Sequence, residues 1–411
     1  MDMSAQSRCS IAVVTTSTAG PARQVSRIEA QPWQILCGLI VSGFLLALPG
    51  GLLPLWGYHI HPEFGTAGNY FLSLGVGIAT GGWMAQRLAH RASLEKLLAA
   101  GCFMGAIALL LLSVAAPPAQ IWLQLIGMLV AGAAAGTVNT AVLEGMATGY
   151  ESNPAAMTLM GGISFGAGSF LAALLMSESF GEEGATRLLA ITALGPAAAG
   201  VAFSRLRIAR SAVPEVSLQD AVRDLRSVLA ILFALLLFFQ FANEWAIAGW
   251  LPVFLIDRMG MSPSGAVKLL ALYWLALVLG RIAAAKLLAV VRHGRMLTAS
   301  ALCALFGCGA LMSSKSMLGI VMGVLLTGAG FSAIYPLAAE RIASRFSYYH
   351  PGYFNGIFTF ALMGGILAPF AVGHLAAGSG LRVVPLAVMA GSFAVFGLVL
   401  VIWLGRKVSG L

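Results

Sequence analysis

The chain has 411 residues, of which 59% are hydrophobic and only 9% are charged, and its mean hydropathy is +0.90. Soluble domains carry roughly 25% charged residues, so this composition excludes a water-soluble globular protein and indicates a chain that crosses a lipid bilayer many times. The formal net charge of +9 does not indicate nucleic-acid binding, because the basic residues fall in the loops between apolar runs. The five cysteines show neither metal-ligand nor disulfide spacing.

The apolar runs predict twelve membrane-spanning helices and therefore an all-α integral membrane protein. Each run has about 20 to 30 residues, which at ~1.5 Å per residue is enough to cross a hydrocarbon core of ~30 Å. Membrane strands would instead read as short segments that alternate in polarity. The predicted helices cover 34–58, 65–88, 96–115, 119–148, 155–178, 186–204, 228–256, 264–290, 296–314, 317–344, 352–377 and 382–404.

A polar stretch in the middle of the chain divides it into two halves that resemble each other. Gly132 and Gly328 lie at the same sequence offset as Glu144 and Glu340, and weak symmetry of this kind is typical of two six-helix repeats. The predicted organisation is a disordered cytoplasmic leader over 1–33, an N-terminal six-helix bundle over 34–204, a cytoplasmic linker over 205–227, a C-terminal six-helix bundle over 228–404 and a cytoplasmic tail over 405–411.

The placement of the basic residues predicts the orientation of the protein in the membrane. Most of the 24 Lys and Arg residues fall in the loops on the side of the two termini, and loops rich in these residues stay in the cytoplasm. The loops on the other side hold Arg187, Arg258, Lys268, Lys315 and Arg382. We therefore expect a multi-pass protein of the inner (plasma) membrane with both termini in the cytoplasm.

The loop between the second and third predicted helices carries a short motif, which runs from Gly82 through Gln86 and Arg87 to Ala89 and Arg91. Together with twelve helices in two halves, it resembles the major facilitator superfamily, whose loop pattern is Gly, three residues, Asp, Arg, one residue, Gly and two basic residues. Here Gln86 replaces the Asp and Ala89 replaces the second Gly. The resemblance implies a latch between the two bundles on the cytoplasmic side, weakened here from a charge pair to a hydrogen bond.

Charged residues near the cytoplasmic ends of the helices are expected to form this gate. We expect Glu144 to pair with Arg87 or Arg91, and Glu340 to pair with Arg281 or Arg345. The alternative is that the two glutamates handle protons or substrate. The predicted gate residues are Gln86, Arg87, Arg91, Glu144, Arg281, Glu340 and Arg345.

Glu244 is the strongest candidate for a functional residue, because it lies in the middle of the apolar run 229–256. A carboxylate at the centre of a spanning helix costs about 2.5–3.5 kcal/mol on insertion and marks a functional site by default. Gln240 lies four residues earlier on the same helix face, and Asn243 lies on the neighbouring face of the helix. A buried acid at this depth suits a reversible proton carrier. The alternative is an acid held permanently by an arginine or by backbone, for packing alone.

The segment 240–253 also resembles the seventh helix of the fucose–galactose–glucose:proton symporter family and its glucose/mannose relatives. The match consists of Asn243-Glu244 and of Gly249-Trp250-Leu251-Pro252, and Asn139-Thr140 and Ile334-Tyr335-Pro336 fit the same family. The chain differs from this family at two places, so the roles of the family's proton-coupling residues do not carry over. The first predicted helix contains no acid, and Ala135 stands where fucose-type members carry a glutamate. Proton coupling must therefore rest on Glu244 or be absent.

Amides, carboxylates and aromatic rings at mid-membrane depth predict a sugar site, because amides and acids pair with hydroxyl groups and rings cover the apolar side of a sugar. Tyr273 and Trp274 fit the outer interface belt equally well. Arg281 is expected to be a structural partner of an acid, and it makes an anionic substrate credible if it lines the cavity. The predicted substrate-binding residues are Asn69, Asn139, Gln240, Asn243, Trp250, Tyr273, Trp274, Tyr335 and Asn355.

These features predict a secondary active transporter that works by alternating access. The first choice is proton-coupled import of a small polar solute, a sugar, with Glu244 as the coupling residue. The alternatives are a proton-coupled exporter of drugs or amphipathic metabolites, an organic-anion transporter, and a membrane receptor or intramembrane enzyme, which the lack of a catalytic motif disfavours. We expect a monomer that is not an enzyme, uses no cofactor or metal, binds no nucleic acid, and has a small-molecule substrate, protons and the lipid bilayer as partners.

Overall fold

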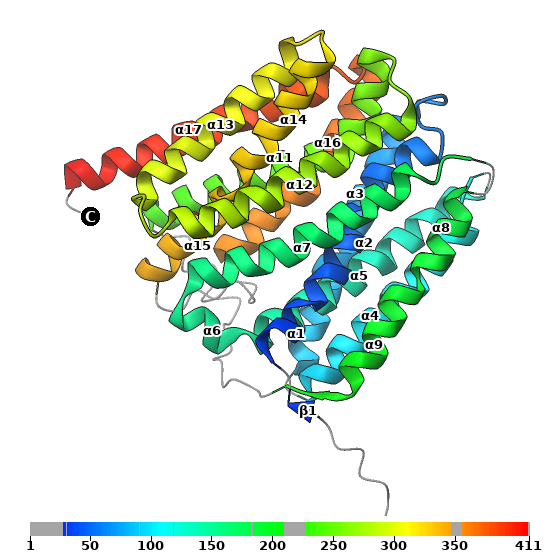
Figure 1. Cartoon of the computed structure of the whole chain (residues 1–411), viewed down its shortest axis with the longest axis horizontal. Helices are drawn as coiled ribbons and strands as arrows, with labels where there is room; N and C mark the ends of the chain where they lie inside the picture. The colour runs from blue at the N-terminus through cyan, green and yellow to red at the C-terminus, as the bar shows by residue number, and fades with distance from the viewer. Residues whose placement is uncertain are drawn as a thin grey trace, which may run out of the picture.

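The computed structural model describes residues 28–29, 31–89, 91–117, 119–181, 184–208, 227–346 and 356–409. These residues form a nearly all-helical protein whose long helices run side by side (Figure 1). The N-terminal half contains α1 (Pro32–Leu36), α2 (Gly38–Leu55), α3 (Phe64–Ala89), α4 (Leu94–Val114), α5 (Ile121–Gly145), α6 (Ala147–Ser152), α7 (Pro154–Ser177), α8 (Gly184–Thr192) and α9 (Leu194–Ser204). The C-terminal half contains α11 (Val228–Met259), α12 (Pro263–Leu287), α13 (His293–Ser313), α14 (Met317–Ser332), α15 (Ile334–Arg345), α16 (Gly356–Ser379) and α17 (Val383–Ser409).

Within the described residues, eleven helical segments are long and apolar enough to cross a membrane. The twelfth predicted span is α3, which has 26 residues and is therefore long enough. It falls short in apolarity because it carries Asn69, Gln86 and Arg87 among several glycines. It packs against α5 of its own half and α16 of the other half. The prediction of an all-helical membrane protein in two six-helix bundles is confirmed.

Two of the predicted spans are broken in the middle rather than continuous. The span predicted over 186–204 is divided into α8 and α9 at Ala193, and the span predicted over 317–344 is divided into α14 and α15 at Ala333. A proline follows three residues after each break, at Pro196 and Pro336. Proline has no amide hydrogen for the carbonyl four residues earlier, and its ring crowds that carbonyl. The breaks therefore follow directly from the sequence.

The leader predicted over 1–33 and the linker predicted over 205–227 lie mostly outside the described residues. Where they are described they are ordered in part. Strand β1 (Ile28–Glu29) pairs in parallel with β2 (Leu206–Arg207), and α1 begins at Pro32. The last residues of the predicted leader thus contact the start of the predicted linker, and the predicted division of the chain stays a prediction.

The two halves meet mainly where α7 packs on α12, α3 packs on α16 and α2 packs on α11. We call the end where α2 finishes and α3 begins the α2–α3 end. The opposite end, where α1 begins and α17 finishes, is the terminal end (Figure 1). The orientation predicted above assigns the terminal end to the cytoplasm.

Two glycines at matching positions of the halves let helices touch backbone to backbone. A Cβ atom on Gly168 of α7 would lie 2.0 Å from the carbonyl oxygen of Ile40 in α2. A Cβ atom on Gly364 of α16 would lie 2.2 Å from the carbonyl oxygen of Phe238 in α11. Only glycine fits such a close approach. The same helix pairing thus repeats in both halves, as the sequence symmetry predicts.

Gly168→Ala and Gly364→Ala are each expected to lower the free energy of unfolding by about 1–3 kcal/mol, because the added methyl group overpacks a backbone contact. Gly397→Ala is the matched control, since no atom lies within 4 Å of its Cβ position. Thermal unfolding of the purified variants in detergent measures the difference. Equal stability of Gly168→Ala and Gly397→Ala would contradict the close approach.

Candidate functional site

A cavity of about 200 Å³ lies between the two halves. Residues of α2, α3, α5 and α7 line it from the N-terminal half, and residues of α11, α12, α15 and α16 line it from the C-terminal half. Most of the wall is aliphatic or aromatic. Its polar lining residues are Asn139, Tyr150, Thr158, Glu244, Arg281 and Tyr335.

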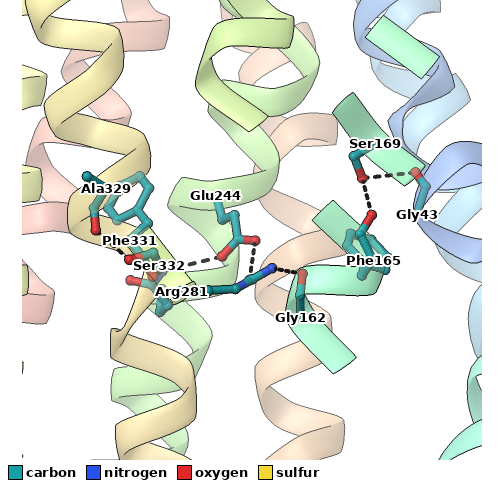
Figure 2. Close-up of polar contacts among 10 residues, drawn as sticks. Gly43, Gly162, Phe165, Ser169, Glu244, Arg281, Ala329, Phe331 and Ser332 are labelled. Atoms are coloured by element: carbon teal, nitrogen blue, oxygen red, sulfur yellow. Dashed lines mark hydrogen bonds and ion pairs between the residues drawn. The ribbon is translucent and has the colours of Figure 1, made fainter. Parts of the chain in front are cut away.

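A buried ion pair stands at the wall of this cavity. Glu244 lies halfway along the 32-residue α11, and its Oε1 lies 3.5 Å from Nη2 of Arg281 in α12. The two residues are only 7% and 5% exposed. Nε2 of Gln240 lies 3.4 Å from Oε2 of Glu244 and donates to the carbonyl of Phe331 over 3.2 Å. Figure 2 shows the carboxylate facing the guanidinium.

Arg281 also connects the two halves of the protein. Its Nη1 donates to the carbonyl oxygen of Gly162 in α7 over 2.5 Å (Figure 2). A Cβ atom on Gly162 would lie 2.7 Å from Nε of Arg281, so glycine is needed for the guanidinium to pass. Nε of Arg281 and Oδ1 of Asn139 are buried and have no hydrogen-bond partner among the described residues. Such unsatisfied atoms on a cavity wall indicate a place for a polar ligand group.

The two halves close the cavity at the α2–α3 end. Trp250 of α11 is fully buried there, and its Nε1 donates to the carbonyl of Pro369 over 2.9 Å. Its ring packs against Phe64 and Phe71 of α3, with ring centroids 6.1 and 5.6 Å apart. A Cβ atom on Gly373 would lie 2.7 Å from Cα of Gly68, so α3 and α16 touch closely at this end.

Polar contacts reinforce the same closure. Nζ of Lys268 in α12 lies 3.0 Å from Oε1 of Glu178, just beyond α7. Ser264 donates to the carbonyl of Ser177 over 2.7 Å. The cavity extends the other way, since Leu36, Met146 and Met157 near the terminal end belong to its lining.

Three of the predicted coupling and substrate-binding residues lie at the cavity, namely Glu244, Asn139 and Tyr335. Gln240 is buried behind Glu244 and supports its carboxylate. Asn243 faces away, toward α17, where its Nδ2 lies 3.5 Å from Oγ of Ser392. The helix turns by about 100° per residue, and this turn moves Asn243 from the cavity face to the face that meets α17.

The other predicted binding residues do not line the cavity. Tyr273 and Trp274 are buried beside it, and Trp274 contacts Phe165 with ring centroids 6.2 Å apart. Trp250 belongs to the closure described above. Asn69 lies near the start of α3, where its Oδ1 is 3.1 Å from Nε2 of His374. Asn355 lies outside the described residues.

The structure separates Arg281 from the other predicted gate residues. The expected pair between Glu340 and Arg281 is wrong, because Arg281 pairs with Glu244 and Oε2 of Glu340 lies 2.8 Å from Nε2 of His293. Arg281 lies at the cavity rather than at the cytoplasmic ends. Arg345, in the last turn of α15, stays at the terminal end and lines a second hollow there.

The remaining predicted gate residues lie at the terminal end. Gln86 and Arg87 are in the last turn of α3, and the guanidinium of Arg87 lies 4.0 Å from the ring centroid of Trp83. Arg91 follows α3 and is exposed, whereas Glu144 is buried in the last turn of α5. Their role as a gate stays a prediction.

Sequence reasoning missed several cavity residues on α6, α7 and α11. Tyr150 and Thr158 are hydrogen-bonded to each other through their hydroxyl groups. Trp245 and Phe165 pack across the two halves, with ring centroids 6.3 Å apart. The position of Trp245 beside Glu244 is the one signal for it, and nothing in the sequence distinguishes the other three from packing residues. Among the described residues, no group of three or more His, Cys, Asp or Glu is placed to hold a metal ion.

The chain resembles known transporters in sequence, although no protein-family model matches it. An uncharacterized transporter of Sinorhizobium fredii is 26% identical over 359 residues, which cover 85% of this chain and 93% of that protein. An uncharacterized MFS-type transporter of Yersinia pestis is 28% identical over 148 residues, which cover 36% of this chain and 38% of that protein.

Solved structures agree on the fold. The fucose:proton symporter of E. coli superposes with a TM-score of 0.63 at 18% identity, over 90% of this chain and 97% of that one. The nucleoside transporter NupG superposes with a TM-score of 0.67 at 14% identity, over 90% of this chain and 98% of that one. These structures show that the chain has the major facilitator fold.

Arg281→Met is expected to lower the free energy of unfolding by about 3–5 kcal/mol, because it leaves the carboxylate of Glu244 buried without its cation. The double variant Glu244→Gln/Arg281→Met removes both charges and should recover most of that loss. Glu178→Gln is the control, because the pair of Glu178 with Lys268 is 64% and 53% exposed and contributes about 0–1 kcal/mol. Unfolding in detergent measures all three. A double variant as unstable as Arg281→Met would contradict the pairing.

Proposed function

We propose that the protein carries a small amphipathic organic anion, bound at Arg281, together with a proton. The observation that supports this most is the place of Arg281, whose buried guanidinium lines the cavity and keeps an unsatisfied Nε. A guanidinium binds a carboxylate or phosphate group in a bidentate way. The aromatic and aliphatic wall around it suits an apolar body attached to that group.

The ion pair supplies a route to proton coupling. A substrate carboxylate that binds Arg281 competes with Glu244 for the same guanidinium. A carboxylate left buried without its cation is costly and is neutralised by taking up a proton. Binding of one anion therefore brings one proton to Glu244, and the two cross the membrane together without net charge movement. Gln240 holds the side chain of Glu244 in place in both steps.

Alternating access follows from the way the two halves close. The contacts around Trp250 and between Lys268 and Glu178 hold the α2–α3 end shut. The cavity extends toward the terminal end, which the basic residues assign to the cytoplasm. In this arrangement the solute would leave to the cytoplasm, and rocking of the halves about the cavity would expose it to the other side.

A sugar is the second candidate substrate, supported by the fold shared with the fucose:proton symporter. The cavity wall argues less strongly for it. Of the amide and aromatic residues predicted to bind a sugar, Asn139 and Tyr335 line the cavity, whereas Gln240, Asn243 and Trp250 are engaged elsewhere. An exporter of lipophilic compounds would use the same apolar wall, with Glu244 as the counter-charge of a cation.

A ligand panel distinguishes these substrate classes. Aromatic and medium-chain carboxylates are expected to raise the melting temperature of the purified protein, because a ligand at 100 times its Kd stabilises the folded state by about 2.7 kcal/mol. Hexoses and lipophilic cations should have little effect. In Arg281→Lys, which keeps the charge but not the planar fork, the shift should shrink. If hexoses alone raise the melting temperature, the substrate is a sugar and not an organic anion.

Glu244→Gln is expected to abolish accumulation of the labelled carboxylate driven by an inward proton gradient in proteoliposomes. Exchange of labelled for unlabelled substrate should persist, because Arg281 still binds the anion. Asp257→Asn is the matched control, an exposed acid near the end of α11 and outside the cavity, and should keep most of the accumulation. If Glu244→Gln accumulates the labelled carboxylate normally, Glu244 does not couple transport to protons.

A further inference from the structure

Asn139 places an amide in the part of the cavity wall that the N-terminal half supplies. The wall around it is largely aliphatic, with Leu39, Leu46, Ile78 and Val142 among its lining residues. Oδ1 of Asn139 is buried and has no hydrogen-bond partner among the described residues. A buried polar atom without a partner is costly, so an amide kept in an apolar wall indicates a ligand group that pairs with it.

The hydroxyl groups of the cavity wall are already engaged. Tyr150 and Thr158 are hydrogen-bonded to each other, and Tyr335 of the C-terminal half is hydrogen-bonded to Tyr150. Among the described residues that line the cavity, Asn139 and Arg281 are the ones with a buried polar atom that lacks a partner. A substrate therefore has two polar groups of the wall to satisfy.

Asn139 and Arg281 lie at a similar depth in opposite halves of the protein. Asn139 lies 18 residues after Ile121, where α5 begins, and Arg281 lies 18 residues after Pro263, where α12 begins. Both helices begin at the α2–α3 end, and at ~1.5 Å per residue both side chains are about 27 Å from their helix starts. One small molecule in the cavity can therefore meet both groups and bridge the halves.

The charge of the cavity wall restricts the group that can meet Asn139. Among the described residues that line the cavity, Arg281 is the one basic residue and Glu244 is the one acid. A second carboxylate or an ammonium group beside Asn139 would be buried without a counter-charge. A hydroxyl group is uncharged, and it can donate to the oxygen or accept from the nitrogen of an amide. It fits Asn139 whichever way the amide is turned.

We propose that the transported anion is a hydroxylated monocarboxylate, whose carboxylate binds Arg281 and whose hydroxyl group, carried on the apolar body, binds Asn139. This inference rests on the anion proposed above and adds the second polar group of the substrate. With both groups bound, the substrate links the C-terminal half to the N-terminal half directly. An acid without the hydroxyl group leaves the amide of Asn139 unpaired and lacks that link.

Matched ligands test the proposal on the wild-type protein in detergent. Isothermal titration calorimetry compares phenylpropanoate with its ortho-, meta- and para-hydroxyl derivatives. At least one derivative is expected to bind about tenfold more tightly than phenylpropanoate, because its hydroxyl group pairs a buried amide that the parent acid leaves unsatisfied. The para-carboxyl derivative, a dicarboxylate, should bind more weakly. The proposal is overturned if every hydroxyl derivative binds no better than phenylpropanoate, or if the dicarboxylate binds more tightly.

Asn139→Leu tests the partner of the hydroxyl group. Leucine matches the aliphatic wall, so the variant should fold and should lose the preference for the hydroxyl derivative. Asn139→Ala should lose it as well, and it serves if leucine blocks the cavity. Thr140→Val is the matched control, because Thr140 follows Asn139 in α5, is 7% exposed and does not line the cavity. Its preference should stay as in the wild type. A preference that survives in both Asn139 variants would overturn the assignment.

Arg281→Lys separates this inference from the proposed function. It should weaken binding of phenylpropanoate and of its hydroxyl derivatives alike, since all of them use the guanidinium. If none of these carboxylates binds the wild type, the proposed anion function itself fails. If they bind in a way that depends on Arg281 but with equal affinity, only the assignment of the hydroxyl group to Asn139 fails.

Discussion

The guanidinium of Arg281 is the group on which the centre of this protein depends. It neutralises the buried carboxylate of Glu244 within the C-terminal half, and it donates to the carbonyl of Gly162 in the N-terminal half. A buried charge is tolerated only when it is paired and hydrogen-bonded. Charge balance and contact between the halves therefore rest on the same side chain. Any ligand that draws Arg281 or Glu244 away from the other changes both at once.

Glycine makes this arrangement possible. The guanidinium passes directly over Gly162, and the indole of Trp245 approaches the Cβ position of Gly365 to 2.8 Å at the cavity wall. Gly168 and Gly364 bring the same pairs of helices into backbone contact in each half. Helices in lipid gain little from apolar burial against each other, so close contact between small residues determines how they pack. In this protein the same contacts also leave room for the large side chains of the site.

The sequence predicted the helices and the position of Glu244 in the middle of its helix well, and the partners of the charged residues poorly. Gln240 and Glu244 share a helix face, as their spacing predicts, and both belong to the central cluster. Asn243 is adjacent in sequence but faces α17. Glu340 was expected to pair with Arg281 or Arg345, but Arg281 pairs with Glu244 and Glu340 lies beside His293. Tyr150 and Thr158 gave no signal, because single hydroxyl groups in apolar helices are common in packing.

The sequence by itself determined that the helices are apolar enough for a lipid bilayer, that they repeat in two halves, and that one acid lies in the middle of a long apolar helix. These properties depend on length, composition and periodicity along one chain segment at a time. Only the tertiary structure decided that Arg281 reaches Glu244 and Gly162, that the wall of the cavity is mostly apolar, and that the halves close around Trp250. The periodicity of a helix defines which residues share a face, but the neighbour that this face meets depends on the rotation and tilt of the helix, which packing against the other helices sets.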